Sequence, residues 1–309
     1  MLDSGEALMR EIRAQPDDDA PRIVYADWLL QSSTDPDVLA HAELIHAQCA
    51  LEHASERPAL QVRVKEILRK YRRIWTSPLT RANIRGNWRF RRGFLHGGTL
   101  TAARFVDVAA QLFELAPMVR SMIFPEASNE LVRLAQSPYL AHLHEVHLDQ
   151  LCRCGRCKIE RELPELFASP HTVNIHTLTL ADCRIDPDNA KRLFESRHLP
   201  KLRVLDLHDN RLDVTSAQAL AARGGTFERL VLAANPIGTD GARALAQATS
   251  LVVADLDLAS CGIEPEGGAA LAEASWAESI TSLDLHDNRI GKGVARGALR
   301  TRFGRRVKL

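Results

Sequence analysis

Apolar residues recur with a shared spacing in the second half of the chain. Residues 202–212 read Leu-Arg-Val-Leu-Asp-Leu-His-Asp-Asn-Arg-Leu, and similar segments begin at Phe227, Val253 and Ile280. An earlier copy begins at Ile175, so successive copies start 27, 25, 26 and 27 residues apart. A period of this length indicates supersecondary units that bury their apolar faces against neighbouring units. The pattern therefore predicts a stack of repeats.

Each repeat predicts a short strand followed by a helix. Alternate side chains of a strand point to one face, so the first, fourth and sixth positions of each copy point into the stack and their neighbours face the other way. Three residues after the sixth position, an asparagine can satisfy backbone groups of the turn. This position holds Asn210, Asn235 and Asn288, with Cys183 and Cys261 in two other copies. Small-residue segments predict helices on the outer side, at 217–221, 241–246 and 268–272.

Two irregular copies precede the regular ones, at residues 119–124 and 143–148. The total is then about seven repeats, and such a stack exposes its core at its open end unless it is capped. We expect Phe303 and Val307, in the tail of the sequence, to cover that end.

The residues before the repeats follow a different, mostly helical pattern. Apolar spacing predicts helices at 5–15, from residue 21 onward, at 58–75 and at 101–115. Residues 88–100 alternate in part and contain a glycine, which predicts a strand or a hairpin.

The repeats resemble the leucine-rich repeat family in its longer, ribonuclease-inhibitor-like form. The segments Ala-Pro-Arg-Ile-Val-Tyr-Ala-Asp-Trp-Leu at 20–29 and Ala-Glu-Leu-Ile-His-Ala-Gln-Cys-Ala-Leu at 42–51 resemble the short companion domain found beside such repeats in planctomycete and myxobacterial proteins. The segment Arg-Arg-Gly-Phe at 91–94 is similar to one that family members carry ahead of their repeats. The likeness covers residues 6–309, least closely at 52–87.

This resemblance implies a fold and a general use. The implied fold is α/β: a right-handed solenoid in residues 96–309, with a curved parallel sheet inside and helices outside, after a small mainly helical domain in residues 1–95 that includes a basic connector. Cysteine is the family's usual alternative to asparagine at the turn position, so Cys183 and Cys261 are expected to be structural. The general use is to bind another macromolecule. Ran-type GTPase activators share the repeat form, which suggests a GTPase-regulating function by analogy of fold only.

Composition narrows the class of protein. Of 309 residues, 45% are hydrophobic and 26% are charged, which is ordinary for a folded domain. The formal net charge is only +1, so the overall charge does not indicate binding to nucleic acid or to a membrane. No apolar run approaches the roughly 20 residues of a membrane helix, and the start of the chain lacks the pattern of a signal peptide. We therefore expect a cytoplasmic monomer, and the resemblance to planctomycete and myxobacterial proteins implies a bacterial source.

The outward positions of the predicted strands are mostly acidic. Acidic charge on a strand face steers a basic partner and raises its association rate. The leading hypothesis is a non-enzymatic protein-interaction scaffold that binds a basic partner there, because the aspartate–histidine pairs on this face have no accompanying nucleophile. The residues assigned to this surface are Glu145, His147, Asp149, Asp206, His208, Arg229, Asp255, Asp257, Asp284 and His286.

A second hypothesis rests on residues 57–104, which hold 13 arginines and lysines but one acid, Glu66, for a local charge of +12. The interleaved aromatic residues are Trp75, Trp88, Phe90 and Phe94. This composition is typical of surfaces that bind nucleic acid or another anionic polymer. The candidate anion-binding residues are Arg69, Arg72, Arg73, Arg89, Arg91 and Arg92. The alternative is a solvated helix face and a connector whose arginine stems and aromatic rings pack on apolar surface.

The segment Cys152-Arg-Cys154-Gly-Arg-Cys157 interrupts the repeat pattern. Three thiols this close can converge on a structural Zn²⁺, which takes four ligands in a tetrahedron. Neighbouring strands lie about 5 Å apart, so Cys183 in the next repeat is the leading fourth ligand. The alternatives for this ligand are His147 and His171. Without metal, the segment is a redox-sensitive or exposed thiol group beside two arginines.

Overall fold

The computed structural model describes residues 4–309 except 55, 126, 128 and 149–158, and its contacts divide the chain into two compact units. Unit 1 comprises residues up to 100 and 107–121, and unit 2 comprises residues 101–106 and 122–309. The boundary predicted between residues 95 and 96 falls within unit 1. The reason is that β2 (Phe94–Thr99) crosses it and pairs antiparallel with β1 (Arg89–Arg91).

Unit 1 is built from helices and one hairpin, which confirms the helical spacing and the hairpin predicted from the sequence. Asp35 caps α3 by accepting a hydrogen bond from the N–H of Asp37 at 2.9 Å, and Pro36 occupies the first turn, where no N–H is needed. Helix α6 (Ala102–Leu115) contributes residues to both units. The other helices are α1 (Ser4–Ala14), α2 (Ala20–Ser32), α3 (Pro36–His53), α4 (Pro58–Trp75) and α5 (Ser77–Arg81).

The hairpin packs on α3 through a tight two-residue turn. Arg92 and Gly93 both have positive φ, 52° and 85°, which matches the turn type that suits the twist of paired strands. A Cβ atom on Gly93 would lie 2.1 Å from Cγ1 of Ile45 on α3, so only glycine allows this approach. The buried residues beneath the hairpin include Ala26, Leu29, Ala42, Ile45 and Cys49.

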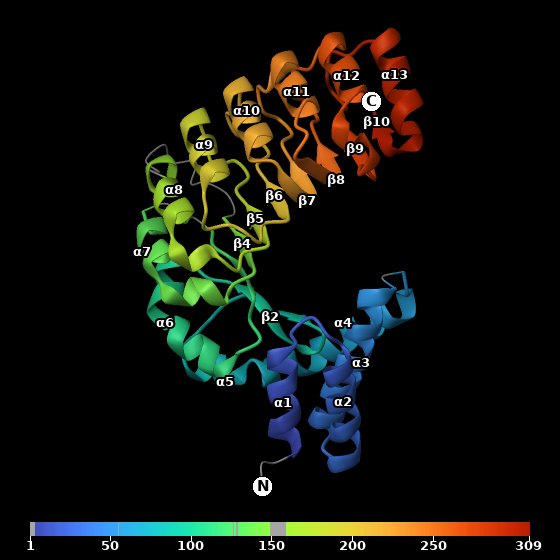
Figure 1. Cartoon of the computed structure of the whole chain (residues 1–309). Coiled ribbons are helices and arrows are strands. Elements are labelled where there is room, and N and C mark those ends of the chain that lie inside the picture. The colour runs from blue at the N-terminus through green and yellow to red at the C-terminus, as the bar shows by residue number, and fades with distance from the viewer. Residues whose placement is uncertain (1–3, 55, 126, 128, 149–158) are drawn as a thin grey trace. The chain divides into compact units, whose positions relative to one another are not determined.

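Unit 2 repeats a strand and a helix, and Figure 1 shows its helices along one side of the strand layer. From β4 to β10 each strand pairs in parallel with the next. The strands are β3 (Ser121–Ile123, shared with unit 1), β4 (Glu145–His147), β5 (Thr177–Thr179), β6 (Val204–Asp206), β7 (Gly225–Val231), β8 (Leu251–Asp257), β9 (Ser282–Asp284) and β10 (Val307–Lys308). The helices are α7 (Leu131–Gln136), α8 (Ile159–Ala168), α9 (Pro187–Glu195), α10 (Val214–Arg223), α11 (Gly238–Ala246), α12 (Pro265–Ala272) and α13 (Val294–Phe303).

Buried asparagines connect successive turns, which confirms the role predicted for this position. Oδ1 of Asn235 accepts a hydrogen bond from the N–H of Leu212 in the preceding repeat at 3.0 Å, and its Nδ2 donates to the carbonyl of Leu207 at 2.9 Å. Asn288 makes the equivalent bonds to Cys261 and Ile263, at 3.0 and 2.9 Å. These bonds satisfy turn groups that the strand ladder does not reach.

The C-terminal residues cover the open end of the last repeat. Phe303 is 2% exposed and Leu299 is fully buried, so the predicted position of Phe303 is confirmed. Val307 lies beside Leu283 as part of β10. The tail therefore caps the stack with both an apolar plug and one more short strand.

Candidate protein-interaction surface

The parallel register lines up two rows of side chains on the strand face opposite the helices. They alternate with buried leucines such as Leu205, Leu256 and Leu283, and therefore point away from the core. The first row is Glu145, Thr177, Val204, Arg229, Asp255 and Ser282. The second row is His147, Thr179, Asp206, Val231, Asp257, Asp284 and Lys308. We refer to both rows together as the strand face.

Three aspartates of the second row adopt the same local geometry. Oδ1 of Asp206, Asp257 and Asp284 accepts a hydrogen bond from the backbone N–H two residues further on, at 3.0, 3.0 and 3.1 Å. This contact holds each carboxylate at the end of its strand. Asp257 and Asp284 are direct register partners on β8 and β9, so their side chains lie side by side.

Two of these aspartates also hold a histidine. Nδ1 of His208 lies 2.9 Å from Oδ1 of Asp206, and Nδ1 of His286 lies 2.6 Å from Oδ1 of Asp284. The hydrogen bond to Asp284, and then the charge of that carboxylate, raise the pKa of His286. Burial opposes ionisation of Asp284, but hydrogen bonds from His286 and Lys308 outweigh it and lower the pKa of Asp284. At neutral pH the carboxylate is thus negatively charged.

Few basic residues offset these carboxylates. Nε of Arg229 lies 3.6 Å from Asp255, and Nζ of Lys308 lies 3.1 Å from Asp284. Within the described part of the chain, no lysine or arginine pairs with Asp206 or Asp257. The acidic centre of the face therefore lies on β6, β8 and β9.

The remaining residues predicted for this surface are separated from that centre. Glu145 and His147 lie on β4, and β5, which presents Thr177 and Thr179, lies between them and β6. Nδ1 of His147 is 2.9 Å from Oγ1 of Thr179, which fixes the ring against the neighbouring strand. Asp149 lies outside the described residues. Sequence reasoning missed Lys308, because only the pairing of β10 with β9 brings it beside Asp284.

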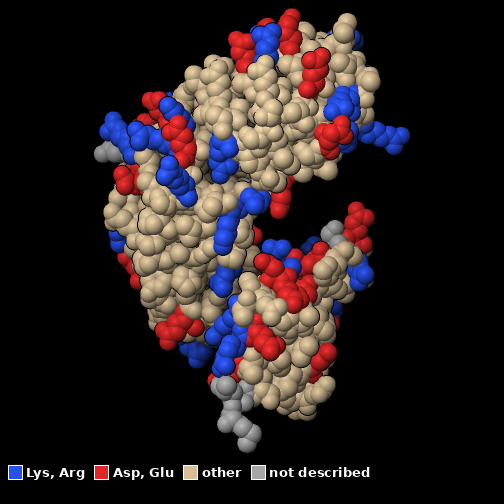
Figure 2. Space-filling model, viewed as in Figure 1, with Lys and Arg blue, Asp and Glu red and all other residues tan. Residues whose placement is uncertain are grey.

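The arginines proposed to bind anions divide into two groups. Arg91 pairs with Glu52 at 2.7 Å, and Arg92, only 14% exposed, pairs with Asp19 at 2.9 Å. Both arginines are therefore paired with acids of unit 1, and their assignment as anion ligands stays a prediction. Figure 2 shows acidic and basic side chains next to each other over the N-terminal helices, not a uniformly basic surface, on the face in view.

The other four arginines remain on the surface or contact neutral groups. Arg89 donates to Oγ of Ser121 at 2.9 Å, and Arg72 donates to Oδ1 of Asn87 at 3.2 Å. Arg69 and Arg73 are exposed on α4. These two are the arginines of the set whose guanidinium groups face solvent without such a contact in the described structure.

The aromatic residues of the basic segment are packed within unit 1. Trp75 stacks on Tyr71 with ring centroids 5.6 Å apart and contacts Phe90 at 5.8 Å. Trp88 is 4% exposed, and a Cβ atom on Gly98 would lie 2.4 Å from its ring. The packing alternative therefore describes Trp88, which is buried, and Trp75 in its contacts with Tyr71 and Phe90. The base-stacking interpretation of the half-exposed rings stays a prediction.

The predicted zinc site lies mostly outside the described residues, since Cys152, Cys154 and Cys157 fall there. Cys183 is 1% exposed, and its Sγ is 3.4 Å from the carbonyl oxygen of Ala181. This is the buried turn position expected from the repeat. Among the described residues, no group of three or more His, Cys, Asp or Glu side chains is arranged to hold a metal. The zinc site stays a prediction.

Comparison with known families agrees with the repeat geometry. The Leucine Rich repeat family matches residues 198–221, 226–246 and 253–272, which cover the repeats around β6, β7 and β8. The chain thus contains leucine-rich repeats. Among curated proteins, no sequence matches the chain. No helix in the described ranges combines the length and apolarity required to cross a bilayer.

Proposed function

We propose that the protein is a protein-interaction scaffold whose strand face binds a basic partner. Leucine-rich repeats suggest such a scaffold, and the observation that supports a basic partner is the alignment of Asp206, Asp257 and Asp284 on nearby parallel strands. These carboxylates belong to the second row of the strand face, so one bound partner could contact all three. In the described structure Lys308 is the one lysine or arginine of that row. Complementary charge of this kind acts mainly on partner choice and association rate.

The spacing of the elements supports a concave form for this face. Packed helices are separated by about 8–10 Å, whereas paired strands are about 4.8 Å apart. A stack with helices on one side and parallel strands on the other must therefore curve toward its strands, which is the solenoid that the ribonuclease-inhibitor-like resemblance implies. We further propose that residues 1–95 form the companion domain, because α2 and α3 carry the segments 20–29 and 42–51 of that resemblance.

The test removes charge without removing the local hydrogen bonds. Substituting Asp206, Asp257 and Asp284 by Asn keeps an oxygen that can accept the backbone N–H of each turn. The control replaces three exposed acids on the helical side, with Asp188 changed to Asn and Glu266 and Glu273 changed to Gln. It changes the net charge by the same amount as the strand-face variant. The probe is a fluorescent octalysine peptide, whose affinity is measured by polarisation at several salt concentrations.

We expect the strand-face variant to bind the peptide at least about tenfold more weakly at low salt, because three charges at the site contribute on the order of 1.4 kcal/mol or more in total. The helical-side variant should retain the affinity of the unmodified protein. Equal weakening in both variants would assign the binding to net charge and overturn the proposal.

A further inference from the structure

Unit 1 contains a hollow of about 340 Å³ that the proposed function does not use. Its apolar lining comes from α1, α4, β1, β2 and the end of α6, and all of it belongs to unit 1. The principal lining side chains are Met9, Trp75, Phe90, Phe94, Leu115 and Met118. We call this hollow the aromatic pocket. Its volume lies within the range of about 300–1,000 Å³ that is usual for small-molecule sites.

The histidine in this pocket is neutral and held in place. Nε2 of His41 lies 2.9 Å from the carbonyl oxygen of Gly93, so this nitrogen carries the proton and donates it. Its ring centroid is 5.3 Å from that of Trp75 and 5.4 Å from that of Phe94. Burial lowers the pKa of His41. The interior therefore suits an apolar or aromatic group and contributes no fixed charge from this ring.

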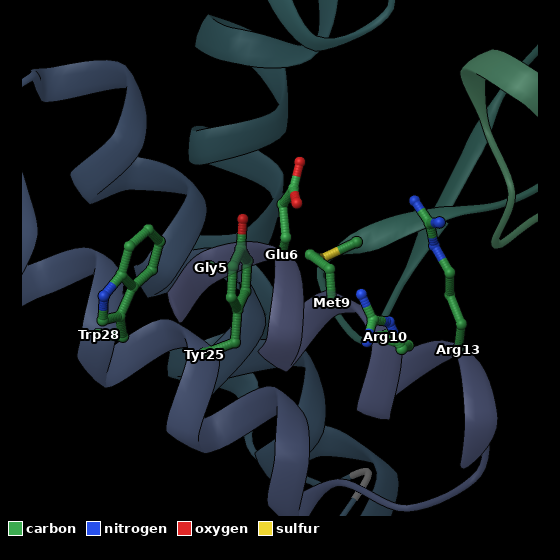
Figure 3. A pocket seen from close by; sticks show the side chains of 7 residues that line it. All are labelled: Gly5, Glu6, Met9, Arg10, Arg13, Tyr25 and Trp28. Carbon is green, nitrogen blue, oxygen red and sulfur yellow. The ribbon is translucent and has the colours of Figure 1, made fainter. Parts of the chain in front are cut away.

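Two opposite charges lie among the lining residues. Arg13 on α1 and Glu114 on α6 are both exposed, and neither forms an ion pair with another described residue. Figure 3 shows Arg13 at the end of α1 away from Trp28, with its guanidinium group extended from the helix. A ligand with one charge would meet attraction from one of these groups and repulsion from the other.

We propose that the aromatic pocket binds a small zwitterion with an apolar body, namely a free amino acid with a large apolar side chain. The side chain lies among Trp75, Phe90 and Phe94, where aromatic packing and burial stabilise it. The carboxylate pairs with Arg13 and the ammonium pairs with Glu114. This ligand matches both the apolar lining and both charges.

A neighbouring groove supplies the control for this assignment. It lies between α1 and α2, has a volume of about 490 Å³, and shares Met9 and Arg13 with the aromatic pocket. Figure 3 shows its remaining lining, in which Tyr25 and Trp28 stack with centroids 5.8 Å apart. Arg10 lines this groove but not the aromatic pocket. A ligand in the groove would therefore depend on Arg10, and a ligand in the aromatic pocket would not.

The experiment measures binding of L-phenylalanine, 3-phenylpropionate and phenethylamine to the full chain by calorimetry and ligand-observed NMR. The second compound lacks the ammonium and the third lacks the carboxylate. We expect L-phenylalanine to bind about twofold to fivefold more tightly than either, since each analogue lacks one charge pair and a pair between exposed groups contributes about 0.2–1 kcal/mol. Equal affinity for 3-phenylpropionate would show that the ammonium group does not contribute and that the pocket binds a simple anion, which would overturn the proposal.

Matched variants locate the site. Arg13→Met and Glu114→Gln should each weaken L-phenylalanine binding about twofold to fivefold. The control variants Arg10→Met and Glu11→Gln, at exposed positions of α1, should leave it unchanged. All four are surface substitutions whose folding is checked by circular dichroism. Absence of binding at millimolar ligand, or loss of binding in Arg10→Met with retention in Glu114→Gln, would rule out the aromatic pocket.

Discussion

Oδ1 of Asn210 accepts a hydrogen bond from the backbone N–H of Cys183, one repeat earlier, at 3.0 Å. The same oxygen accepts the N–H of Ile185 at 2.9 Å, and Nδ2 donates to the carbonyl of Leu180 at 2.8 Å. One side chain thus satisfies three backbone groups in the turn of the preceding repeat, which lie beyond the hydrogen bonds between the strands. The repeats are joined by this buried polar network as well as by their leucines.

Substitution of Asn210 by Ala should lower the free energy of unfolding by about 2–4 kcal/mol, because buried N–H groups of the preceding turn lose their acceptor. The measurement is urea unfolding followed by circular dichroism. Arg211→Ala, at the exposed position that follows, is the control and should change stability by less than about 0.5 kcal/mol. Similar stability of the two variants would show that the turns do not depend on the asparagine.

Arg92→Met in unit 1 should be strongly destabilising. Arg92 and Asp19 are each 14% exposed and 2.9 Å apart, so the substitution leaves a nearly buried carboxylate with the exposed ring of His53, 3.0 Å away, as its remaining ion-pair partner in the described structure. We expect a loss of about 2–4 kcal/mol in thermal or urea unfolding. Arg91→Met is the matched comparison, since the side chain of Arg91 is 44% exposed, and should cost at most about 1 kcal/mol. The reverse order of the two effects would contradict this assignment.

Gly93→Ala should destabilise unit 1 by at least about 2 kcal/mol. The residue has φ of 85°, and an added Cβ atom would lie 2.1 Å from Ile45 and 2.9 Å from its Cα. Both the backbone strain and the clash act against the folded state. Gly297→Ala, on α13 where an added Cβ meets nothing within 4 Å, serves as the control. We expect it to leave stability unchanged or slightly increased, because alanine favours helix.

His286 should titrate above its ordinary pKa, because its ring is bound to Asp284. The raised pKa means that its contribution to stability is fully present below about pH 6.5, the unfolded value, and is lost as pH rises through the folded value. Imidazole NMR measures this titration directly. Asp284→Asn should lower the pKa of His286, whereas Asp287→Asn, with a longer contact of 3.6 Å, should have a smaller effect. An unchanged pKa in Asp284→Asn would remove Asp284 as the cause.

The repeat half of the fold could be predicted because its signals are local and periodic. The spacing from Leu202 to Phe227 places Leu205 beside Leu230 in register, as observed. The role of Asn210 followed from its place after the sixth position, which recurs in several copies. Each copy supplied independent support for the same strand, turn and helix.

The interactions that the sequence could not show join residues far apart in the chain. Arg92 looked like a free cation because its partner Asp19, the N-cap residue before α2, reaches it only through the packing of the hairpin on α3. Lys308 could be predicted only as part of the C-terminal tail. Its strand, β10, has two residues, which is too short to show an alternating pattern in the sequence. Tertiary contacts, not local spacing, decide how much charge on each surface stays available.

The central claim is that the strand face of β6 to β9 binds a basic partner. The most direct measurement is backbone amide NMR of the full chain during addition of the octalysine peptide. The account predicts that the largest shift changes lie at Asp206, Asp257 and Asp284 and at their register neighbours. Changes concentrated instead on the acids of unit 1, such as Asp17 and Asp18, would contradict it.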